Sequence, residues 1–189
     1  MTSFLELPEV RERMHRMSVE EYHRAGQTGV LSEDVELLRG IVVTKMPKSS
    51  LHEFVAQKLT DLLLAKVAGS FKVRTERPLT LRDSEPEPDI SVVLGKPEDW
   101  IAAHPSTAHL VVEIAVSSTA VDEGKAEIYA EAGIQEYWLV RRVNRTVEVY
   151  RQPTREGYVF RQTFTEQEVL ACASLPGLRL SLSEILPVA

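Results

Sequence analysis

The chain has 189 residues, of which 43% are hydrophobic and 26% are charged, and these values are ordinary for a globular protein with one core. The formal net charge of −6 argues against a general electrostatic binder of nucleic acid, although a local basic groove, or basic residues gathered by dimerisation, remains open. No apolar run approaches the roughly 18 residues of a membrane helix, and the first residues lack the pattern of a secretory signal. With Cys172 as the single cysteine, we expect a cytoplasmic protein that does not enter a membrane.

Hydrophobic periodicity divides the chain into an N-terminal arm, residues 1–17, and a single domain, residues 18–189. Capping-box patterns at Ser18–Glu21 and Ser50–Glu53 predict that each of these serines is a helix N-cap. The predicted elements in chain order are a helix from Ser18 to about Gly26, a hairpin of Val35–Leu38 and Ile41–Met46, a helix from Ser50 to about Ala68, strands Phe71–Leu81 and Ile90–Leu94, a strand Leu110–Val116, a helix from about Asp122 to Ala132, a hairpin of Glu136–Arg141 and Thr146–Arg151, strands Tyr158–Thr165 and Leu178–Leu182, and a helical turn at Ser183–Leu186. This order predicts an α/β or α+β domain with helices against a central sheet.

The strand Leu110–Val116 contains one charged residue, Glu113, in the middle of an apolar run. An unpaired carboxylate in a dry interior is strongly unfavourable, so Glu113 must be paired, protonated, metal-bound or open to a cleft. The next helix begins with an acidic pair followed by Lys125, which brings a basic group within reach of the end of this strand.

A second carboxylate, Asp89, follows Pro88 and begins the preceding strand, 24 residues before Glu113. If the two strands are neighbours, both carboxylates can point into one cleft, where oxygen ligands suit Mg²⁺ or Mn²⁺. Such an ion can generate hydroxide and neutralise charge on a phosphodiester, and Lys125 would assist the attacking water. The alternative is structural: Asp89 caps a turn and Glu113 is paired with an arginine.

Three segments together resemble the Uma2 family, formerly a domain of unknown function (DUF820), in the PD-(D/E)xK restriction-endonuclease-like superfamily. They are the Pro-Asp before a β run at Asp89, the Val-Glu-Ile strand followed by Ser-Ser-Thr, and an Asp-x-x-Lys-x-x-x-Tyr helix leading to Glu-Tyr-Trp. The resemblance extends from about Ser18 to the C-terminus. It implies a mixed central sheet flanked by helices, with an additional N-terminal hairpin and C-terminal antiparallel strands.

By this resemblance, Asp89 is the motif aspartate and Glu113 is the second acidic metal ligand. The lysine expected two residues after the glutamate is absent, because Ala115 stands there. Ser117 stands where many family members also have serine. The next candidate for the basic group is Lys125, on the following helix.

Two further positions enter the predicted site through the helix that precedes the core sheet. His52 matches the family histidine and could ligate the ion or contact phosphate. Glu53 could be an outer acidic group, although the capping box also explains it. Glu87 is an acidic neighbour of Asp89 that an exposed turn explains equally well.

The sequence therefore predicts a Mg²⁺- or Mn²⁺-dependent endonuclease that hydrolyses DNA phosphodiester bonds, with Asp89, Glu113, Lys125 and His52 at the site. A homodimer is expected, because related nucleases often pair to cut two strands and because the hairpin leaves sheet edges open. The rival interpretations are a catalytically inactive nuclease-fold module for binding or regulation, and a structural partner of another protein. The arginines of the C-terminal strands could form a basic edge for phosphates or salt bridges on a solvated face.

Overall fold

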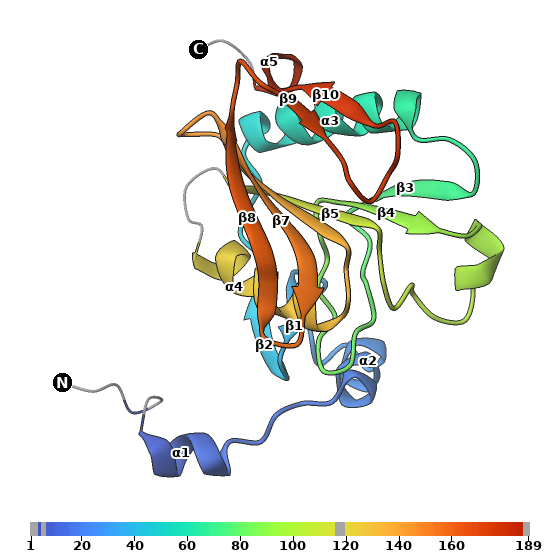
Figure 1. Ribbon diagram of the computed structural model, residues 1–189. Helices are drawn as coiled ribbons and strands as arrows, with labels where there is room; N and C mark the ends of the chain where they lie inside the picture. The colour runs from blue at the N-terminus through green and yellow to red at the C-terminus, as the bar shows by residue number, and fades with distance from the viewer. Residues whose placement is uncertain (1–3, 5–6, 116–119, 187–189) are drawn as a thin grey trace.

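The computed structural model describes residue 4 and residues 7–115 and 120–186. Six strands form one sheet in the spatial order β3-β4-β5-β6-β7-β8 (Figure 1). Their bounds are Phe71–Thr75, Ile90–Leu94, Leu110–Ala115, Glu136–Arg141, Thr146–Thr154 and Gly157–Thr165. Neighbouring strands are antiparallel except β5 and β6, which are parallel and are connected by helix α4 (Ala120–Glu131). A parallel pair needs such a crossover, because a tight turn can join only antiparallel strands.

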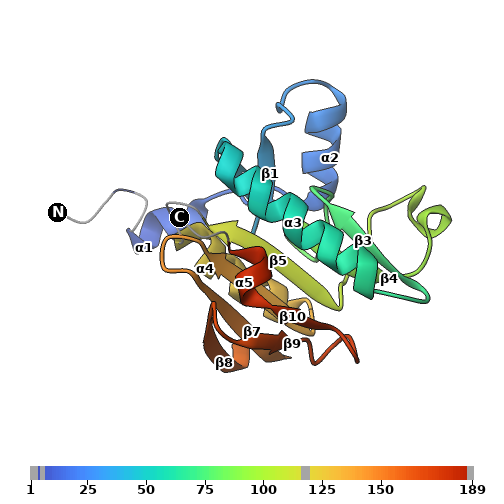
Figure 2. The ribbon, with the colours of Figure 1, turned by 90° about the horizontal axis from the view of Figure 1, so that it is seen from above.

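The two faces of the sheet have separate cores. Along β5, Val112 and Ile114 pack on the face covered by helix α3 (Ser50–Lys66), and Val111 and Ala115 pack on the face covered by α4. This alternation follows from the two-residue period of a strand. Strands β9 (Val169–Ala171) and β10 (Arg179–Ser181) and helix α5 (Leu182–Ile185) complete the layer that contains α3 (Figure 2). Because layers of helices cover both faces of the sheet at β5, every residue of this strand is buried.

The N-terminal elements lie beside the sheet end where β4 begins. They are helices α1 (Pro8–Arg13) and α2 (Val19–Gln27) and the hairpin of β1 (Val35–Leu38) and β2 (Ile41–Thr44). The Tyr22 hydroxyl donates to the Val35 carbonyl at 2.9 Å, and Leu37 makes an isolated β-bridge with Glu85. Helix α1 buries no residue and projects away from the sheet in Figure 1. The domain boundary after residue 17 stays a prediction.

The predicted fold class is confirmed: a mixed central sheet flanked by helices, with an additional N-terminal hairpin and a C-terminal strand pair. The hairpin of β6 and β7 and the helix before it lie where the sequence predicted them. The β4–β5 connection contains a 3-10 helix, η2 (Pro97–Trp100). No helix in the described ranges is long and apolar enough to cross a membrane.

Some predicted boundaries were wrong for local reasons. Strand β3 ends at Thr75 rather than Leu81, because Glu76 adopts a left-handed backbone with φ of 49°. The short strand β9 was missed. The N-cap of α3 is Ser49, whose side chain accepts from the His52 backbone N–H at 3.2 Å, so the second capping box was wrong by one residue. The predicted end of the central strand, Val116, lies outside the described residues.

Candidate active site

The strand register brings the two predicted carboxylates together. Strands β4 and β5 pair with Ile90 opposite Val112, so Asp89 and Glu113 are the next pair along the same ladder. Their exposed fractions are 7% and 4%. Strands β4 and β5 are thus neighbours, which is the condition under which Asp89 and Glu113 can share one cleft.

Asp89 is held by donors from three directions. Its Oδ2 accepts from His52 Nε2 at 2.9 Å and from the Ile114 N–H at 2.8 Å, and its Oδ1 lies 3.1 Å from Lys48 Nζ. Burial alone would raise the pKa of Asp89, but the hydrogen bond and charge of His52, the charge of Lys48 and the Ile114 N–H together lower it. Asp89 is therefore a carboxylate whose charge the surrounding structure favours.

Glu113 has the opposite balance of forces. Its Oε1 accepts from Lys125 Nζ at 3.0 Å and from the Tyr129 hydroxyl at 2.7 Å. Burial raises the pKa of Glu113 to about 8, with Lys125 acting in the opposite direction and Asp89 and the other neighbouring carboxylates adding to the rise. The single lysine does not compensate for the dry surroundings and the negative charges near Glu113.

Two of those neighbouring carboxylates were not predicted as site residues. Glu36 of β1 is 4% exposed, and its Oε1 lies 3.0 Å from Lys125 Nζ. The signal that could have found Glu36 is the one that marked Glu113, an acidic residue inside an otherwise apolar strand. Asp122 of α4 is half-buried, and burial is the main cause that raises its pKa to about 6. Lys125 thus lies between strands β1 and β5 and is shared by two buried carboxylates.

The remaining predicted residues differ in how close they lie to Asp89 and Glu113. His52 is buried and contacts Asp89, as described above, although its Nδ1 has no hydrogen-bond partner in the structure. Glu53 is exposed and is not the N3 residue of a capping box. Glu87 forms an ion pair with Lys45 at 3.0 Å, and its backbone N–H donates to Glu36.

Ala115 packs in the core on the α4 face. Ser117 lies outside the described residues.

We define the acidic cluster as Glu36, Asp89, Glu113 and Asp122. Lys48, Lys125 and His52 are the basic groups that contact it, so the four carboxyl groups of the cluster outnumber its two lysines. Buried carboxylate oxygens with excess negative charge are the donors that a hard divalent cation prefers. Within the described ranges, no three acidic, histidine or cysteine side chains already converge as metal ligands. The donor chemistry fits Mg²⁺ or Mn²⁺, while lysine and histidine hold the individual carboxylates.

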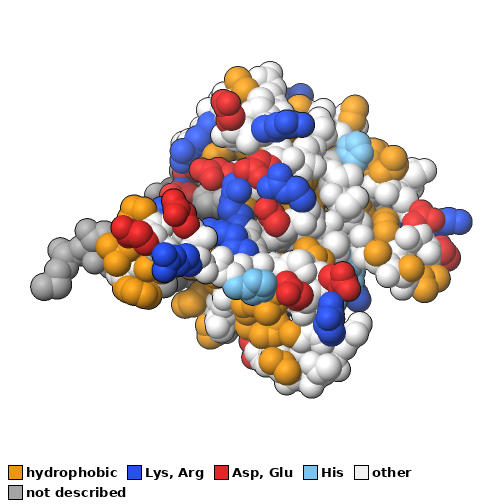
Figure 3. Space-filling view, turned by 90° about the horizontal axis from the view of Figure 1, so that it is seen from below, with side chains coloured by type: hydrophobic (Ala, Val, Ile, Leu, Met, Phe, Trp, Pro, Cys, Tyr) orange, Lys and Arg blue, Asp and Glu red, His pale blue; other side chains and the backbone are white. Residues whose placement is uncertain are grey.

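Several arginines of the C-terminal strands are engaged in ion pairs, which argues against a continuous basic edge. Arg141 pairs with Glu123 and Glu148, and Arg151 pairs with Glu136. On the face seen from below, basic and acidic side chains are also intermixed (Figure 3). These observations favour the salt-bridge interpretation over a phosphate-binding edge.

The model of the family described as "Uma2: Putative restriction endonuclease" matches residues 19–183. A crystal structure from Anabaena variabilis, described as "a putative nuclease belonging to DUF820", superposes with a TM-score of 0.73 at 18% sequence identity. The match covers 89% of this chain and 97% of that one. Among the curated proteins, none matches.

Proposed function

Because the chain belongs to the Uma2 family, we propose that it is a divalent-metal-dependent endonuclease that hydrolyses phosphodiester bonds of DNA. The observation that carries the proposal is the acidic cluster, in which buried carboxylates outnumber the lysines that contact them. Burying several carboxyl groups together is costly, whether they are ionised or protonated, so their presence favours a function that needs them.

In this proposal Asp89 and Glu113 hold Mg²⁺ or Mn²⁺ through their carboxylate oxygens. The bound cation would supply Lewis-acid stabilisation of the phosphodiester and a water of lowered pKa. His52 fixes the Asp89 carboxylate through Oδ2. Lys125 is a positioning residue, because its ammonium holds Glu113 and favours the ionised form of that carboxylate.

The test is DNA cleavage by the parent and by the Asp89→Ala, Glu113→Ala double variant, with Mg²⁺ or Mn²⁺ and a panel of duplex and branched DNA. We expect cleavage by the parent and a loss of at least about 100-fold in the double variant, since both ligand carboxylates are removed. Glu156→Gln, in the exposed β7–β8 turn, is the matched control and should cleave like the parent. Equal cleavage by the double variant and the parent would contradict the proposal, provided circular dichroism finds both folded.

A second candidate is a catalytically inactive module that keeps the fold and the ability to bind. Ala115 in place of the strand lysine favours this candidate, as do the ion pairs that already hold Asp89 and Glu113. The same assay separates the two functions, because the inactive module cleaves none of the DNA panel even when it binds Mn²⁺.

A further inference from the structure

Lys48 is a basic residue at the acidic cluster that the family resemblance does not assign. It lies in the connection between β2 and α3, and its Nζ is 3.1 Å from Asp89 Oδ1 and 3.0 Å from Glu76 Oε1. Its side chain is 31% exposed, compared with 6% for Lys125. Lys48 is therefore the lysine of the cluster that solvent, and hence a substrate, can reach.

The two oxygens of Asp89 have different surroundings. Oδ2 faces the interior, where His52 Nε2 and the Ile114 N–H donate to it. Oδ1 is the oxygen that Lys48 contacts. A divalent cation bound to Asp89 would compete with the Lys48 ammonium for this carboxylate, because two positive groups at short distance repel each other.

Lys125 cannot easily serve a phosphodiester. Its ammonium is enclosed between Glu113 and Glu36, at 3.0 Å from each. If Lys125 moved to a phosphate, two buried carboxylates would lose their counter-charge, which is strongly destabilising. A different basic side chain must therefore contact the phosphate.

Glu76 gives Lys48 a second partner that is independent of Asp89. Its backbone is left-handed, a conformation that is strained for a non-glycine residue, and its N–H donates to the Asp89 carbonyl at 3.2 Å. The Glu76 backbone is thus fixed close to Asp89, and its exposed carboxylate extends to Lys48. The Lys48 ammonium therefore has two carboxylate partners, Glu76 at 3.0 Å and Asp89 at 3.1 Å.

We propose that Lys48 is the phosphate-binding lysine of this site, taking the place of the strand lysine that is absent at Ala115. Lys48 neutralises Asp89 while no divalent cation is bound, and it contacts the scissile phosphodiester when Asp89 binds the cation. This inference rests on the proposed nuclease function. It also explains how a site rich in carboxyl groups can admit a polyanion, since cation binding frees a partly exposed lysine.

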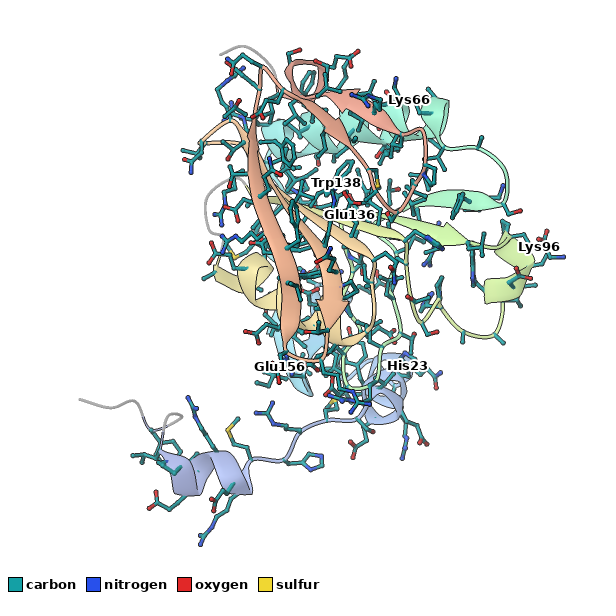
Figure 4. All side chains as sticks on the ribbon, viewed as in Figure 1. His23, Lys66, Lys96, Glu136, Trp138 and Glu156 are labelled. Atoms are coloured by element: carbon teal, nitrogen blue, oxygen red, sulfur yellow. The ribbon has the colours of Figure 1, made fainter. Side chains whose placement is uncertain are left out.

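The experiment uses Lys48→Met, Lys48→Arg and the control Lys66→Met in the full chain. Lys66 is at the opposite end of α3 from His52, 14 residues or about 21 Å along the helix (Figure 4). Calorimetry measures Mn²⁺ affinity without DNA. Fluorescence anisotropy measures the affinity for a labelled DNA duplex in Ca²⁺ over a range of salt concentrations.

Lys48→Met should bind Mn²⁺ roughly tenfold more tightly than the parent, because a competing charge is removed. It should bind DNA several-fold more weakly, with a salt slope reduced by about one, as for the loss of one phosphate contact. Lys48→Arg and Lys66→Met should resemble the parent in both measurements. The arginine variant keeps the charge, so it separates loss of the cation from damage to the fold.

Two results would overturn the inference while the nuclease function stands. The first is a Lys48→Met variant that binds Mn²⁺ with the same affinity as the parent. The second is a Lys48→Met variant that binds Mn²⁺ but has the same DNA affinity and salt slope as the parent. Absence of Mn²⁺ binding in the parent and in all variants would instead remove the proposed metal site, and the role of Lys48 with it.

Discussion

Two buried glutamates of this protein have different chemical surroundings, although both lie within apolar strands. Glu136 has no exposed surface and accepts from Trp138 Nε1, from Arg151 and from the backbone N–H groups of Ala173 and Ser174. Among the described residues, Glu113 accepts from Lys125, which it shares with another carboxylate, and from the Tyr129 hydroxyl. Both glutamates are buried, so the number of donors, and not burial by itself, separates the structural carboxylate Glu136 from Glu113.

The raised pKa of Glu113 predicts how the stability of the metal-free protein depends on pH. A carboxyl whose pKa rises from 4.5 to about 8 on folding contributes stability below about pH 4.5, and this contribution is lost as the pH rises towards 8. Glu113→Gln removes the titrating group. Between about pH 5 and about pH 8, the free energy of unfolding of the parent should therefore fall relative to that of the variant. The difference should be at least about 1.4 kcal/mol, the value of one pKa unit.

Urea unfolding of the parent and Glu113→Gln in the presence of a chelator measures this difference. Asp89 has a lowered pKa and loses its stabilising contribution only as the pH falls through the acidic range, and it is present in both proteins. Parallel pH profiles for the two proteins would show that Glu113 does not titrate in this range.

At the scale of elements, Glu136 anchors the C-terminal segment to the sheet. It belongs to β6, and the N–H groups it accepts lie between β9 and β10, where Figure 4 shows Glu136 and Trp138 inside the molecule. These two strands and α5 complete the core layer against α3. The segment therefore depends on one carboxylate for part of its position.

Glu136→Gln should lower the free energy of unfolding by about 2–4 kcal/mol, because an amide N–H₂ would face a donor and Arg151 would lose its charge partner. Glu156→Gln changes the same group on an exposed turn and should stay within about 0.5 kcal/mol of the parent. Urea denaturation at one pH compares the three proteins. A loss below about 1 kcal/mol in Glu136→Gln would mean that the segment is held by apolar packing alone.

The elements that could be predicted from the sequence are those with strong local patterns. Strand β5 was identified from its apolar run and α2 from the capping box at Ser18, in which both reciprocal hydrogen bonds form. The end of β3 depends on the left-handed backbone of Glu76, and β9 has only three residues, so neither has a periodic pattern to detect. For α3, adjacent serines offered two N-caps, and the side chain of Ser49 made the bond.

At the scale of the whole molecule, the site is assembled from segments far apart in sequence. Asp89 and Glu113 were identifiable from local patterns, because Asp89 directly precedes one apolar strand and Glu113 interrupts the next one. The contact between Glu36 and Lys125 joins the N-terminal hairpin to α4, and no local pattern indicates which hairpin side chain meets which helix. Lys48 was likewise missed, since a lysine in a connecting segment is ordinarily a solvated one.

The net charge of −6 restricts where a nucleic acid can bind. Described arginines on the C-terminal strands and the face in Figure 3 are balanced by nearby carboxylates. Affinity for DNA should therefore come from the site itself and depend on the divalent cation. The sheet ends in two open edges, β3 and β8, and a homodimer through such an edge stays a prediction.

The most direct test of the central claim is Mn²⁺ binding by calorimetry to the parent, Glu113→Gln, Asp89→Asn and the control Glu156→Gln. The two site substitutions keep the shape of the side chain and remove its charge. We predict binding by the parent and the control, and a loss of at least about tenfold in affinity in each site variant. No binding by the parent, or equal binding by all four proteins, would contradict the assignment of the acidic cluster as a divalent-cation site.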